Sequence, residues 1–344
     1  MPPDPVRVLI ATPLEPGYVA RIEAVDPRVS ALYEPALLPE PRYPADHTGA
    51  PRALSETGLG RWAALRAQAD VSFDFDWQDP AQMPRNCPRL RWVQGTSAGL
   101  GGFLQRTGLA DSGLVFTTAA GVHGTPLAEY VLLGLLYFAK DMPTLAARQA
   151  RRHWEQHAGG QLAGRRVLLV GLGGIGRQVA RLLSAVGVEV CGAGRSGHSY
   201  DVPGVTSYLP SDRLDEALPR VDAVVLACPL TEQTRGLIGH RQLALMRPGA
   251  VLVNVSRGPV VDEDAMVDAL RSGHLGGAFL DVFATEPLPA DSALWQLPNV
   301  VISPHSASVV PAENELITEL FCENLRRWLA GQPLRNVYDR TAGY

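Results

Sequence analysis

The sequence predicts an α/β protein with two domains, each built on a doubly wound parallel sheet. Short apolar runs that are typical of buried strands alternate with helical segments along most of the chain. A glycine-rich turn, Gly171-Leu-Gly-Gly-Ile-Gly, lies directly between one such run and a helical segment. The length of 344 residues exceeds what one small core needs and suits two domains.

The composition is that of a globular protein without a nucleic-acid partner. Hydrophobic residues make up 46% of the chain and charged residues 19%. The net charge of −4 gives no basic excess of the kind that nucleic-acid binding needs. The 4 cysteines are scattered without metal-ligand spacing, and no apolar segment is long enough to span a bilayer. We therefore expect a cytoplasmic protein with no metal site and no membrane partner.

The first third of the chain predicts one set of alternating strands and helices. Strands are expected at residues 6–12 and near 29–33, 71–75, 90–94 and 114–118, with a helix at 17–25. Residues 35–52 are rich in proline and polar residues and predict a surface loop.

Two longer helices are expected outside this set. Thr125-Pro126 is a cap followed by a first-turn proline, and it predicts the start of a helix over residues 125–150. The centre of this helix is apolar all round, so it would be buried on more than one side, either within the chain or at a subunit interface. An amphipathic helix near 312–330 would pack back against the first domain.

Residues 165–305 predict a second sheet, of the kind that binds dinucleotides. Its six strands are expected at 166–170, 188–192, 221–227, 250–255, 277–282 and 300–303. The glycine-rich turn follows the first of these strands without a gap, and a helical segment that ends at Gly187 follows the turn. Its glycines permit close backbone approach to a pyrophosphate, whose charge the N–H groups and the helix dipole would bind.

The end of the second strand in this sheet indicates the type of coenzyme. Sites that select NAD place Asp or Glu there to hold the ribose 2′-hydroxyl. This chain has Gly194, Arg195 and Ser196 instead, so no carboxylate would repel a 2′-phosphate and a guanidinium could bind one. We expect NADP(H), with NAD(H) as the alternative if Arg195 is only a solvated loop residue.

Three polar residues follow strands in the last third of the chain. Arg257 comes after the strand at 250–255, Glu286 after 277–282, and His305 after 300–303. Open α/β sheets bind ligands at the carboxyl ends of their strands, where these residues would meet. A cation can hold an anionic keto acid and polarise its carbonyl, an imidazole can deliver the proton, and a carboxylate can keep the imidazole protonated. Alone, Arg257 would be a surface or helix-capping group, Glu286 a solvated loop carboxylate and His305 a structural histidine, but together they favour a carbonyl reductase.

Two other groups of residues are interpreted as structural. His153 and His157 are four residues apart, as in a zinc-protease helix, but the glutamate between them is displaced and two glycines follow, so we expect a surface helix end. Trp92 and Trp154 are expected in the core, with the substrate pocket as the alternative.

Taken together, the motifs resemble the D-isomer-specific 2-hydroxyacid dehydrogenases over nearly the whole chain. The matching segments are Gly171-Leu-Gly-Gly-Ile-Gly, Pro229-Leu-Thr-Glu-Gln-Thr-Arg-Gly-Leu-Ile, Val253-Asn-Val-Ser-Arg-Gly, Leu280-Asp-Val-Phe-Ala-Thr-Glu-Pro and Ser303-Pro-His. Within the family, the chain looks most like the glyoxylate/hydroxypyruvate reductases, and Gly194-Arg195 is similar to their NADP-preferring members. One departure is Leu100-Gly-Gly-Phe, where many relatives carry an Asp.

The resemblance implies a split arrangement of domains and a role for each site residue. Residues 1–118 and 306–344 would form a flavodoxin-like substrate domain, with a Rossmann coenzyme domain at 119–305 inserted into it. Arg257 would bind the substrate, His305 would be the general acid with Glu286 as its partner, and the N–H groups of Ala98 and Gly99 would contact the substrate carboxylate. The implied coenzyme contacts are Gly171, Gly173, Gly174, Ile175, Gly176, Arg195, Ser196, Cys228, Pro229, Thr234, Val255, Ser256 and Asp281, the last at the nicotinamide carboxamide.

The function expected from these observations is NADPH-dependent reduction of small 2-keto acids, with glyoxylate and hydroxypyruvate as first substrates, to D-2-hydroxy acids. The family resemblance also implies a homodimer. Two alternatives remain: a dinucleotide-sensing binding protein, like the corepressors that share this fold, and a dehydrogenase of another oxyanion such as phosphite.

Overall fold

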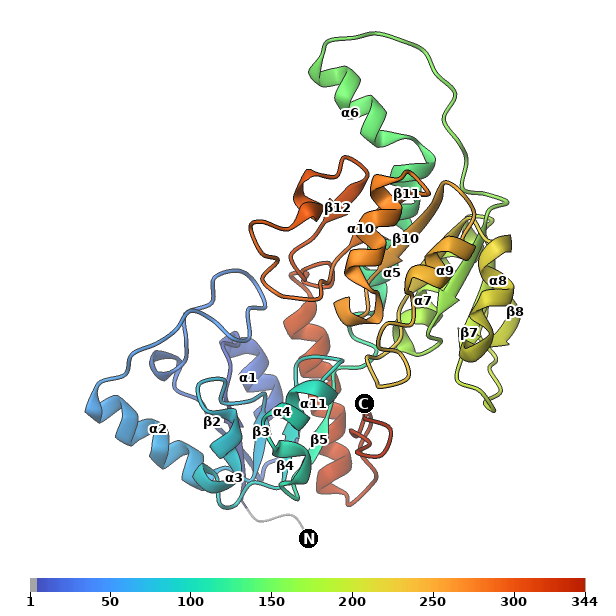
Figure 1. The fold of residues 1–344 in the computed structure, drawn as a ribbon. Coiled ribbons are helices and arrows are strands. Elements are labelled where there is room, and N and C mark those ends of the chain that lie inside the picture. Colours follow the sequence, from blue (N-terminus) through green and yellow to red (C-terminus); the bar gives the residue numbers. More distant parts are fainter. Residues whose placement is uncertain (1–4, 344) are drawn as a thin grey trace. The chain divides into compact units, whose positions relative to one another are not determined.

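The computed structural model describes residues 5–343 and contains two units (Figure 1). The inserted unit is Gly124–Ser308, and the terminal unit consists of the residues up to His123 together with those from Val309 onward. Each unit has one parallel sheet with helices on both faces, which confirms the predicted fold class. Residues 1–4 and 344, which the predicted domain limits include, lie outside the described residues.

The terminal unit has a five-stranded sheet in the order β2-β1-β3-β4-β5, the flavodoxin-like order. All the predicted strands of this part are present. The strands are β1 (Val6–Ile10), β2 (Val29–Leu32), β3 (Val71–Phe73), β4 (Trp92–Gln94) and β5 (Val115–Thr117). The helices are α1 (Pro16–Glu23), α2 (Glu56–Gln68), α3 (Met83–Asn86), α4 (Gly101–Arg106) and α11 (Glu313–Leu329).

The core of the terminal unit lies on both faces of this sheet. Val8 and Ile10 of β1 pack with α1 and α11, whereas Leu9 between them packs on the opposite face with α2. This alternation follows from the period of two in a strand. Trp92 is fully buried, as expected, and its Nε1 donates a hydrogen bond to Thr117 Oγ1 at 2.7 Å.

A buried carboxylate joins the two parts of the terminal unit. Glu313, the first residue of α11, has its Oε1 3.1 Å from His123 Nε2 and 3.7 Å from His47 Nε2. Burial alone would raise the pKa of Glu313, but hydrogen bonding and the charges of the two imidazoles lower it to about 2. Since His123 ends the first segment of the unit and Glu313 begins its last helix, this contact connects segments that are distant in sequence.

The inserted unit has a seven-stranded sheet in the order β12-β11-β10-β9-β6-β7-β8. Its strands are β6 (Arg166–Val170), β7 (Glu189–Gly194), β8 (Val205–Pro210), β9 (Ala223–Leu226), β10 (Ala250–Asn254), β11 (Leu275–Leu280) and β12 (Val300–Ile302). The six predicted strands are all present, but β8 was not predicted. It is an edge strand with no fully buried residue, so it lacks the apolar run that marks a central strand.

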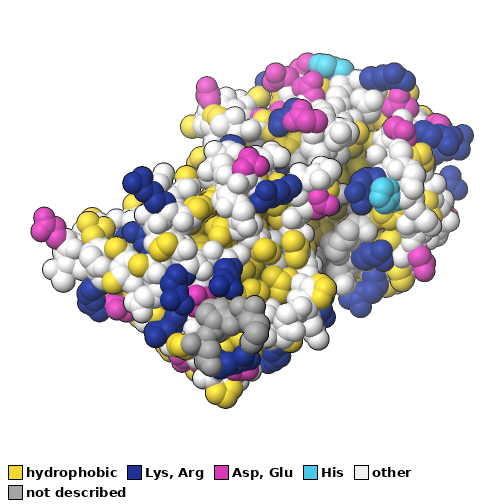
Figure 2. Space-filling model, turned by 90° about the horizontal axis from the view of Figure 1, so that it is seen from below, with side chains coloured by type: hydrophobic (Ala, Val, Ile, Leu, Met, Phe, Trp, Pro, Cys, Tyr) yellow, Lys and Arg dark blue, Asp and Glu magenta, His cyan; other side chains and the backbone are white. Residues whose placement is uncertain are grey.

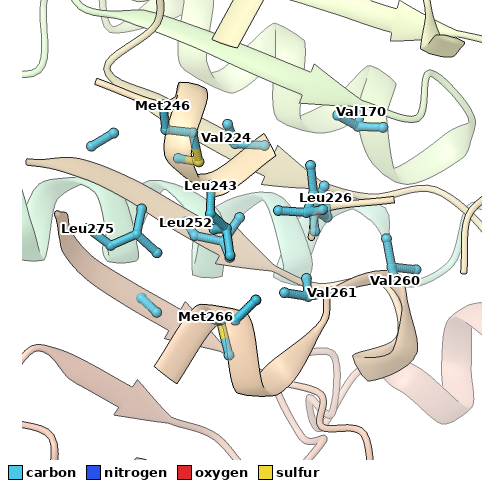
Figure 3. Close-up of a cluster of buried hydrophobic side chains, with 14 of the residues drawn as sticks. Val170, Val224, Leu226, Leu243, Met246, Leu252, Val260, Val261, Met266 and Leu275 are labelled. Atoms are coloured by element: carbon cyan, nitrogen blue, oxygen red, sulfur yellow. The ribbon is translucent and has the colours of Figure 1, made fainter. Parts of the chain in front are cut away.

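Helices cover the two faces of this sheet separately. The helices are α5 (Gly124–Ala139), α6 (Met142–Ala150), α7 (Gly174–Ala185), α8 (Leu214–Ala217), α9 (His240–Leu245) and α10 (Glu263–Arg271). Residues of α5 and α7 form the core on one face, and residues of α8, α9 and α10 form it on the other. In the second core, Leu243 of α9 and Met266 of α10 lie over Leu252 of β10 (Figure 3).

The single helix predicted at residues 125–150 is in fact two helices, and that prediction was wrong. Asp141 between α5 and α6 has a φ of +53°, and Pro143 lies in the first turn of α6. A left-handed residue cannot continue a right-handed helix, and proline lacks the N–H that an interior position needs. The α5 helix is also exposed on one side, at Leu133 and Leu136, and α6 has no buried residue.

Charged side chains of both signs lie on the surface of the protein. Basic and acidic side chains are interspersed on the face seen in Figure 2, in keeping with the small net charge of −4. None of the described helices has both the length and the apolar content to cross a membrane.

Trp154 is 93% exposed, so the expectation that it lies in the core was wrong.

Glu313→Gln should make the free energy of unfolding depend less on pH. The pKa of Glu313 is about 2 in the folded protein and 4.5 ordinarily. The contribution of its ionised carboxylate to the free energy of unfolding is therefore complete above pH 4.5 and is lost as the pH falls toward 2. We expect the variant to lose about 3 kcal/mol at pH 7, and less at pH 3, in urea unfolding experiments.

The control for this measurement is Glu315→Gln on the same helix. The Glu315 side chain is 50% exposed and pairs with Arg21, so this change should alter stability by less than about 1 kcal/mol. A stability loss in Glu313→Gln that stays constant between pH 7 and pH 3 would contradict the assignment.

Candidate active site

Arg257 lies in a tight loop after β10 that the side chain of Asn254 holds. Asn254 Oδ1 accepts hydrogen bonds from Ser256 N at 3.0 Å and Ser256 Oγ at 2.7 Å, and its Nδ2 donates to Arg257 O at 3.2 Å. Val255 and Ser256 are both buried. Arg257 Nη1 donates to Ser256 O at 2.7 Å, so the loop holds the guanidinium group of Arg257 as well as its backbone.

The loop after β11 packs directly against the loop that carries Arg257. A Cβ added to Gly258 would lie 1.9 Å from the carbonyl carbon and oxygen of Phe283, so glycine alone permits this approach. Phe283 N donates to Glu286 Oε1 at 3.0 Å, and Glu286 Oε2 lies 2.7 Å from His305 Nδ1. The structure therefore pairs the predicted carboxylate and imidazole.

The ionisation of Glu286 determines how this pair can act. Burial raises its pKa, but the hydrogen bonds from His305 and Phe283 N and the nearby charges of His305 and Arg257 outweigh burial, and the pKa is lowered overall. An ionised carboxylate only accepts, so His305 Nδ1 carries a hydrogen and Nε2 is the ring atom that can exchange a proton. The side chains of His305 and Glu286 are 42% and 36% exposed, so a dissolved molecule can reach them.

The loop that carries His305 is fixed by Asp281. Asp281 Oδ1 accepts hydrogen bonds from Ser303 Oγ at 2.6 Å, Ser306 N at 2.9 Å and Ala307 N at 2.9 Å. His305 has a φ of +53°, a conformation that non-glycine residues rarely adopt, and these bonds hold the backbone around it. Burial raises the pKa of Asp281 although the hydrogen bonds oppose that rise. Its expected contact with the nicotinamide carboxamide stays a prediction.

The guanidinium of Arg257 is a partly desolvated cation close to this pair. Burial lowers its pKa, while the charges of Glu286 and Asp281 act in the opposite direction. Arginine remains protonated in proteins, so the inserted unit presents a positive charge beside an imidazole–carboxylate pair. Such an arrangement can attract an anion, stabilise negative charge on an oxygen and exchange a proton.

The predicted glycine-rich turn connects β6 to α7 and is closely packed on its inner side. Gly171 has a φ of +101°, and a Cβ there would lie 2.6 Å from the backbone of Ala227. A Cβ on Gly176 would lie 2.0 Å from Gly171 O. These two positions therefore require glycine for the turn to form at all.

The outer side of the same turn is open. A Cβ on Gly173 would meet no heavy atom within 4 Å. Gly174 and Ile175 begin α7, so the N–H groups at the start of this helix point to the open side, where they suit an anion. The turn therefore fits the diphosphate of a dinucleotide.

At the end of β7, Gly194 is followed by Arg195 and Ser196, both of which are exposed. Arg195 N donates a hydrogen bond to Tyr200 Oη at 2.8 Å. The strand end therefore has no carboxylate, which agrees with the sequence, and the loop beyond it is tied back by a tyrosine.

The loop after β9 contains three of the predicted coenzyme contacts. Cys228 is buried, and burial raises the pKa of its thiol to about 11, so it is a thiol at neutral pH. Thr234 Oγ1 donates to Pro229 O at 2.7 Å and accepts from Thr231 N at 2.7 Å, so Thr234 braces this loop. Contact of these residues with a coenzyme stays a prediction.

The remaining predicted residues belong to the terminal unit. Ala98 and Gly99 lie in the turn between β4 and α4, where Gly99 N donates to Ser97 Oγ at 3.3 Å. Leu100, the first residue of the departing segment Leu100-Gly-Gly-Phe, is buried, and its Cδ1 lies 2.4 Å from where a Cβ on Gly95 would be. Leu100 thus packs against Gly95, and the role of Ala98 and Gly99 toward a substrate stays a prediction.

Three residues that shape the site were not predicted. Asn254 and Ser303 orient the loops of Arg257 and His305, and Tyr200 holds the loop after β7. The first two are polar residues directly at strand ends, which is a usable sequence signal. The sequence gives no such signal for Tyr200, because its contact with Arg195 depends on the path of the loop after β7.

Comparison with known proteins identifies relatives of this chain. A family model described as "D-isomer specific 2-hydroxyacid dehydrogenase, NAD binding domain" matches residues 132–307. The (S)-sulfolactate dehydrogenase of Chromohalobacter salexigens is 37% identical over 225 residues, which are 64% of this chain and 71% of that protein. The D-3-phosphoglycerate dehydrogenase of Mycobacterium tuberculosis is 34% identical over 258 residues, 73% of this chain but only 47% of that protein.

Solved structures match almost the whole chain. A D-isomer specific 2-hydroxyacid dehydrogenase from Xanthobacter autotrophicus, in complex with NADPH and MES, has a TM-score of 0.79 and 29% identity and covers 99% of this chain and 100% of its own. An NADPH-dependent glyoxylate/hydroxypyruvate reductase from Sinorhizobium meliloti, in complex with NADP and sulfate, has a TM-score of 0.77 and 27% identity, with 98% and 100% covered.

Alanine at two glycines of the turn should affect different properties, stability in one case and coenzyme binding in the other. Gly176→Ala places a Cβ 2.0 Å from Gly171 O and should lower the melting temperature by several degrees. Gly173→Ala meets nothing within 4 Å, so it should keep the melting temperature but weaken binding of NADPH about tenfold, because its methyl group stands on the open side of the turn. Thermal unfolding and fluorescence titration measure the two effects. Unchanged NADPH affinity in Gly173→Ala would refute the placement of the diphosphate.

Proposed function

This chain belongs to the D-isomer specific 2-hydroxyacid dehydrogenase family and is an NAD(P)-dependent enzyme, and from that premise we propose that it reduces small 2-keto acids to D-2-hydroxy acids with NADPH. Glyoxylate and hydroxypyruvate are the proposed substrates. The observation that carries the proposal is the 2.7 Å contact between His305 Nδ1 and Glu286 Oε2 beside the guanidinium of Arg257.

Each member of this group has a proposed task in the reaction. Arg257 binds the carboxylate and the keto oxygen of the substrate, and its charge stabilises the negative charge that develops on that oxygen. His305 Nε2 gives its proton to the oxygen, while Glu286 stabilises the imidazolium through Nδ1. NADPH, when bound, supplies the hydride for the keto carbon.

In this proposal, the inserted unit binds the coenzyme at its glycine-rich turn and also carries the three side chains that act on the substrate. The N–H groups of Ala98 and Gly99 are proposed to contact the substrate carboxylate. The cytoplasmic location that the sequence suggests stays a prediction.

The preference for NADP(H) over NAD(H) is supported by the end of β7. No carboxylate is present at Gly194 to repel a 2′-phosphate, and Arg195 and Ser196 are exposed there. The solved structures from X. autotrophicus and S. meliloti were obtained with NADPH and NADP, respectively, which agrees with the proposal for this chain.

Initial rates for a panel of substrates with NADPH and NADH test the proposed function. Glyoxylate, hydroxypyruvate, pyruvate, sulfopyruvate and phosphohydroxypyruvate are assayed as keto acids, and phosphite is assayed with NADP+. We expect the highest kcat/KM for glyoxylate or hydroxypyruvate, and at least about a tenfold advantage of NADPH from one charge-assisted contact. Turnover of phosphite alone, or coenzyme binding without any turnover, would favour the oxyanion dehydrogenase or the binding protein instead.

His305→Ala and Arg257→Ala should each lower kcat by about 10²-fold or more, because one removes the proton donor and the other the oxyanion stabiliser. Glu286→Gln keeps the shape of the side chain but not its charge and should have a smaller effect. His240→Ala, at the exposed start of α9, is the matched control and should keep wild-type kcat. Near-normal turnover in either of the first two variants would refute these roles.

We also propose that two copies of the chain associate through α5 and α6. Leu133 is 55% exposed, Met142 39% and Leu145 38%, and the chain itself leaves every residue of α6 unburied. A helix with exposed apolar side chains and no buried residue of its own can be stabilised by a second copy. In Figure 1, α6 extends away from the sheet of the inserted unit.

Light scattering during gel filtration measures this association. The chain of 37.0 kDa should elute as a dimer, and Leu133→Glu should shift it toward the monomer without changing the melting temperature of the monomeric unit by more than a few degrees. A monomeric wild type, or a dimer that Leu133→Glu leaves intact, would contradict the proposed interface.

A further inference from the structure

The ring of Tyr200 fills the space beside the end of β7. A Cβ added to Gly194 would lie 2.3 Å from Tyr200 Cε2, 2.4 Å from its Cζ and 2.8 Å from its Oη. All of these are closer than the 3.0 Å that real Cβ atoms keep from other heavy atoms. No side chain can therefore be present at residue 194 while Tyr200 holds this position.

Tyr200 is held there by contacts at both ends of its loop. Arg195 N, directly after β7, donates to Tyr200 Oη at 2.8 Å. Directly after Tyr200, Asp201 O accepts a hydrogen bond from Arg177 Nη1 of α7 at 2.9 Å. The ring of His198 lies 6.4 Å from the tyrosine ring, centroid to centroid, within the same loop. The loop is thus tied to the strand and to the helix that flank the predicted coenzyme site.

The hydroxyl of Tyr200 can donate a hydrogen bond, whereas the carboxylate that the ring would exclude from position 194 can only accept one. A carboxylate at the end of this strand accepts a hydrogen bond from a ribose 2′-hydroxyl. In Tyr200, Oη accepts the bond from Arg195 N, so the hydroxyl hydrogen is directed to another acceptor. A 2′-phosphate presents only acceptors at neutral pH, and it would meet a donor here instead of a repelling charge.

We propose that Tyr200 is a residue that determines coenzyme specificity: its ring excludes an acidic side chain from position 194, and its hydroxyl donates to the 2′-phosphate of NADP(H). This inference rests on the proposed preference for NADP(H) and deepens it. It also makes the two positions interdependent, because an acid at residue 194 requires a smaller residue at 200.

Equilibrium binding of two coenzyme fragments tests the role of the hydroxyl without relying on turnover. 2′,5′-ADP contains the 2′-phosphate and 5′-AMP lacks it, and calorimetric titration gives the affinity for each. We expect Tyr200→Phe to weaken 2′,5′-ADP binding about tenfold, the effect of one hydrogen bond to a charged group, and to leave 5′-AMP binding within about twofold.

Tyr208→Phe is the matched control for this experiment. Tyr208 Oη also accepts a backbone hydrogen bond, from Val202 N at 2.8 Å, but it belongs to β8. It should leave the ratio of the two affinities unchanged. Unchanged 2′,5′-ADP affinity in Tyr200→Phe, or an equal loss for both fragments, would overturn the role of the hydroxyl.

Gly194→Asp, alone and combined with Tyr200→Ala, tests whether the tyrosine ring excludes an acidic side chain from position 194. Gly194→Asp alone should lower the melting temperature and bind both fragments poorly, because the new Cβ overlaps the tyrosine ring. The double variant should recover the melting temperature and bind 5′-AMP more tightly than 2′,5′-ADP. A stable single variant that already prefers 5′-AMP would overturn the steric role.

The wild-type protein separates this inference from the function on which it rests. Equal affinity of the wild type for both fragments would overturn the NADP(H) preference itself, and the role of Tyr200 with it. A wild type that prefers 2′,5′-ADP while Tyr200→Phe retains that preference would overturn the inference about the hydroxyl alone.

Discussion

A buried carboxylate that accepts three hydrogen bonds on one oxygen fixes the geometry on which the candidate active site depends. Asp281 is 2% exposed, and burial of a charge is tolerated only where hydrogen bonds replace the lost water. Its Oδ1 meets that need by accepting from Ser303, Ser306 and Ala307, and so it defines the path of the backbone between them. His305 lies within that path, and its left-handed conformation brings Nδ1 to Glu286. Contacts to Asp281 thus hold the backbone on either side of His305, the proposed proton donor, and Glu286 holds its side chain.

Much of this arrangement could be predicted because parallel strands leave a strong sequence signal. Strands such as β6, β9 and β10 are buried on both faces and appear as continuous apolar runs, so their ends can be found in the sequence. Polar residues directly after those ends must lie along one edge of the sheet. The pairing of Glu286 with His305 follows from that rule, although 19 residues separate them.

The features that could not be predicted lie in exposed segments, whose path along the protein surface is not marked by an apolar pattern. β8 is an edge strand without an apolar run, and the break between α5 and α6 depends on one left-handed residue, Asp141. Trp154 was expected in the core but is 93% exposed, because the residue type alone does not show whether a tryptophan is buried. The contact between Tyr200 and Gly194 is of the same kind, since it arises from the path of a loop and not from a periodic pattern.

The discontinuous construction of the terminal unit has a consequence for how the chain is made. Phe321 and Leu325 of α11 are fully buried against Val8 and Ile10, so the sheet that is synthesised first lacks part of its cover until the last helix emerges. The contact between His123 and Glu313 spans 190 residues, which a ribosome adds in about 10–40 seconds. The inserted unit is continuous and can fold during that interval, while the apolar face of the nascent first sheet stays uncovered. The core on this face of the first sheet is therefore completed only after Glu313–Leu329 has been synthesised.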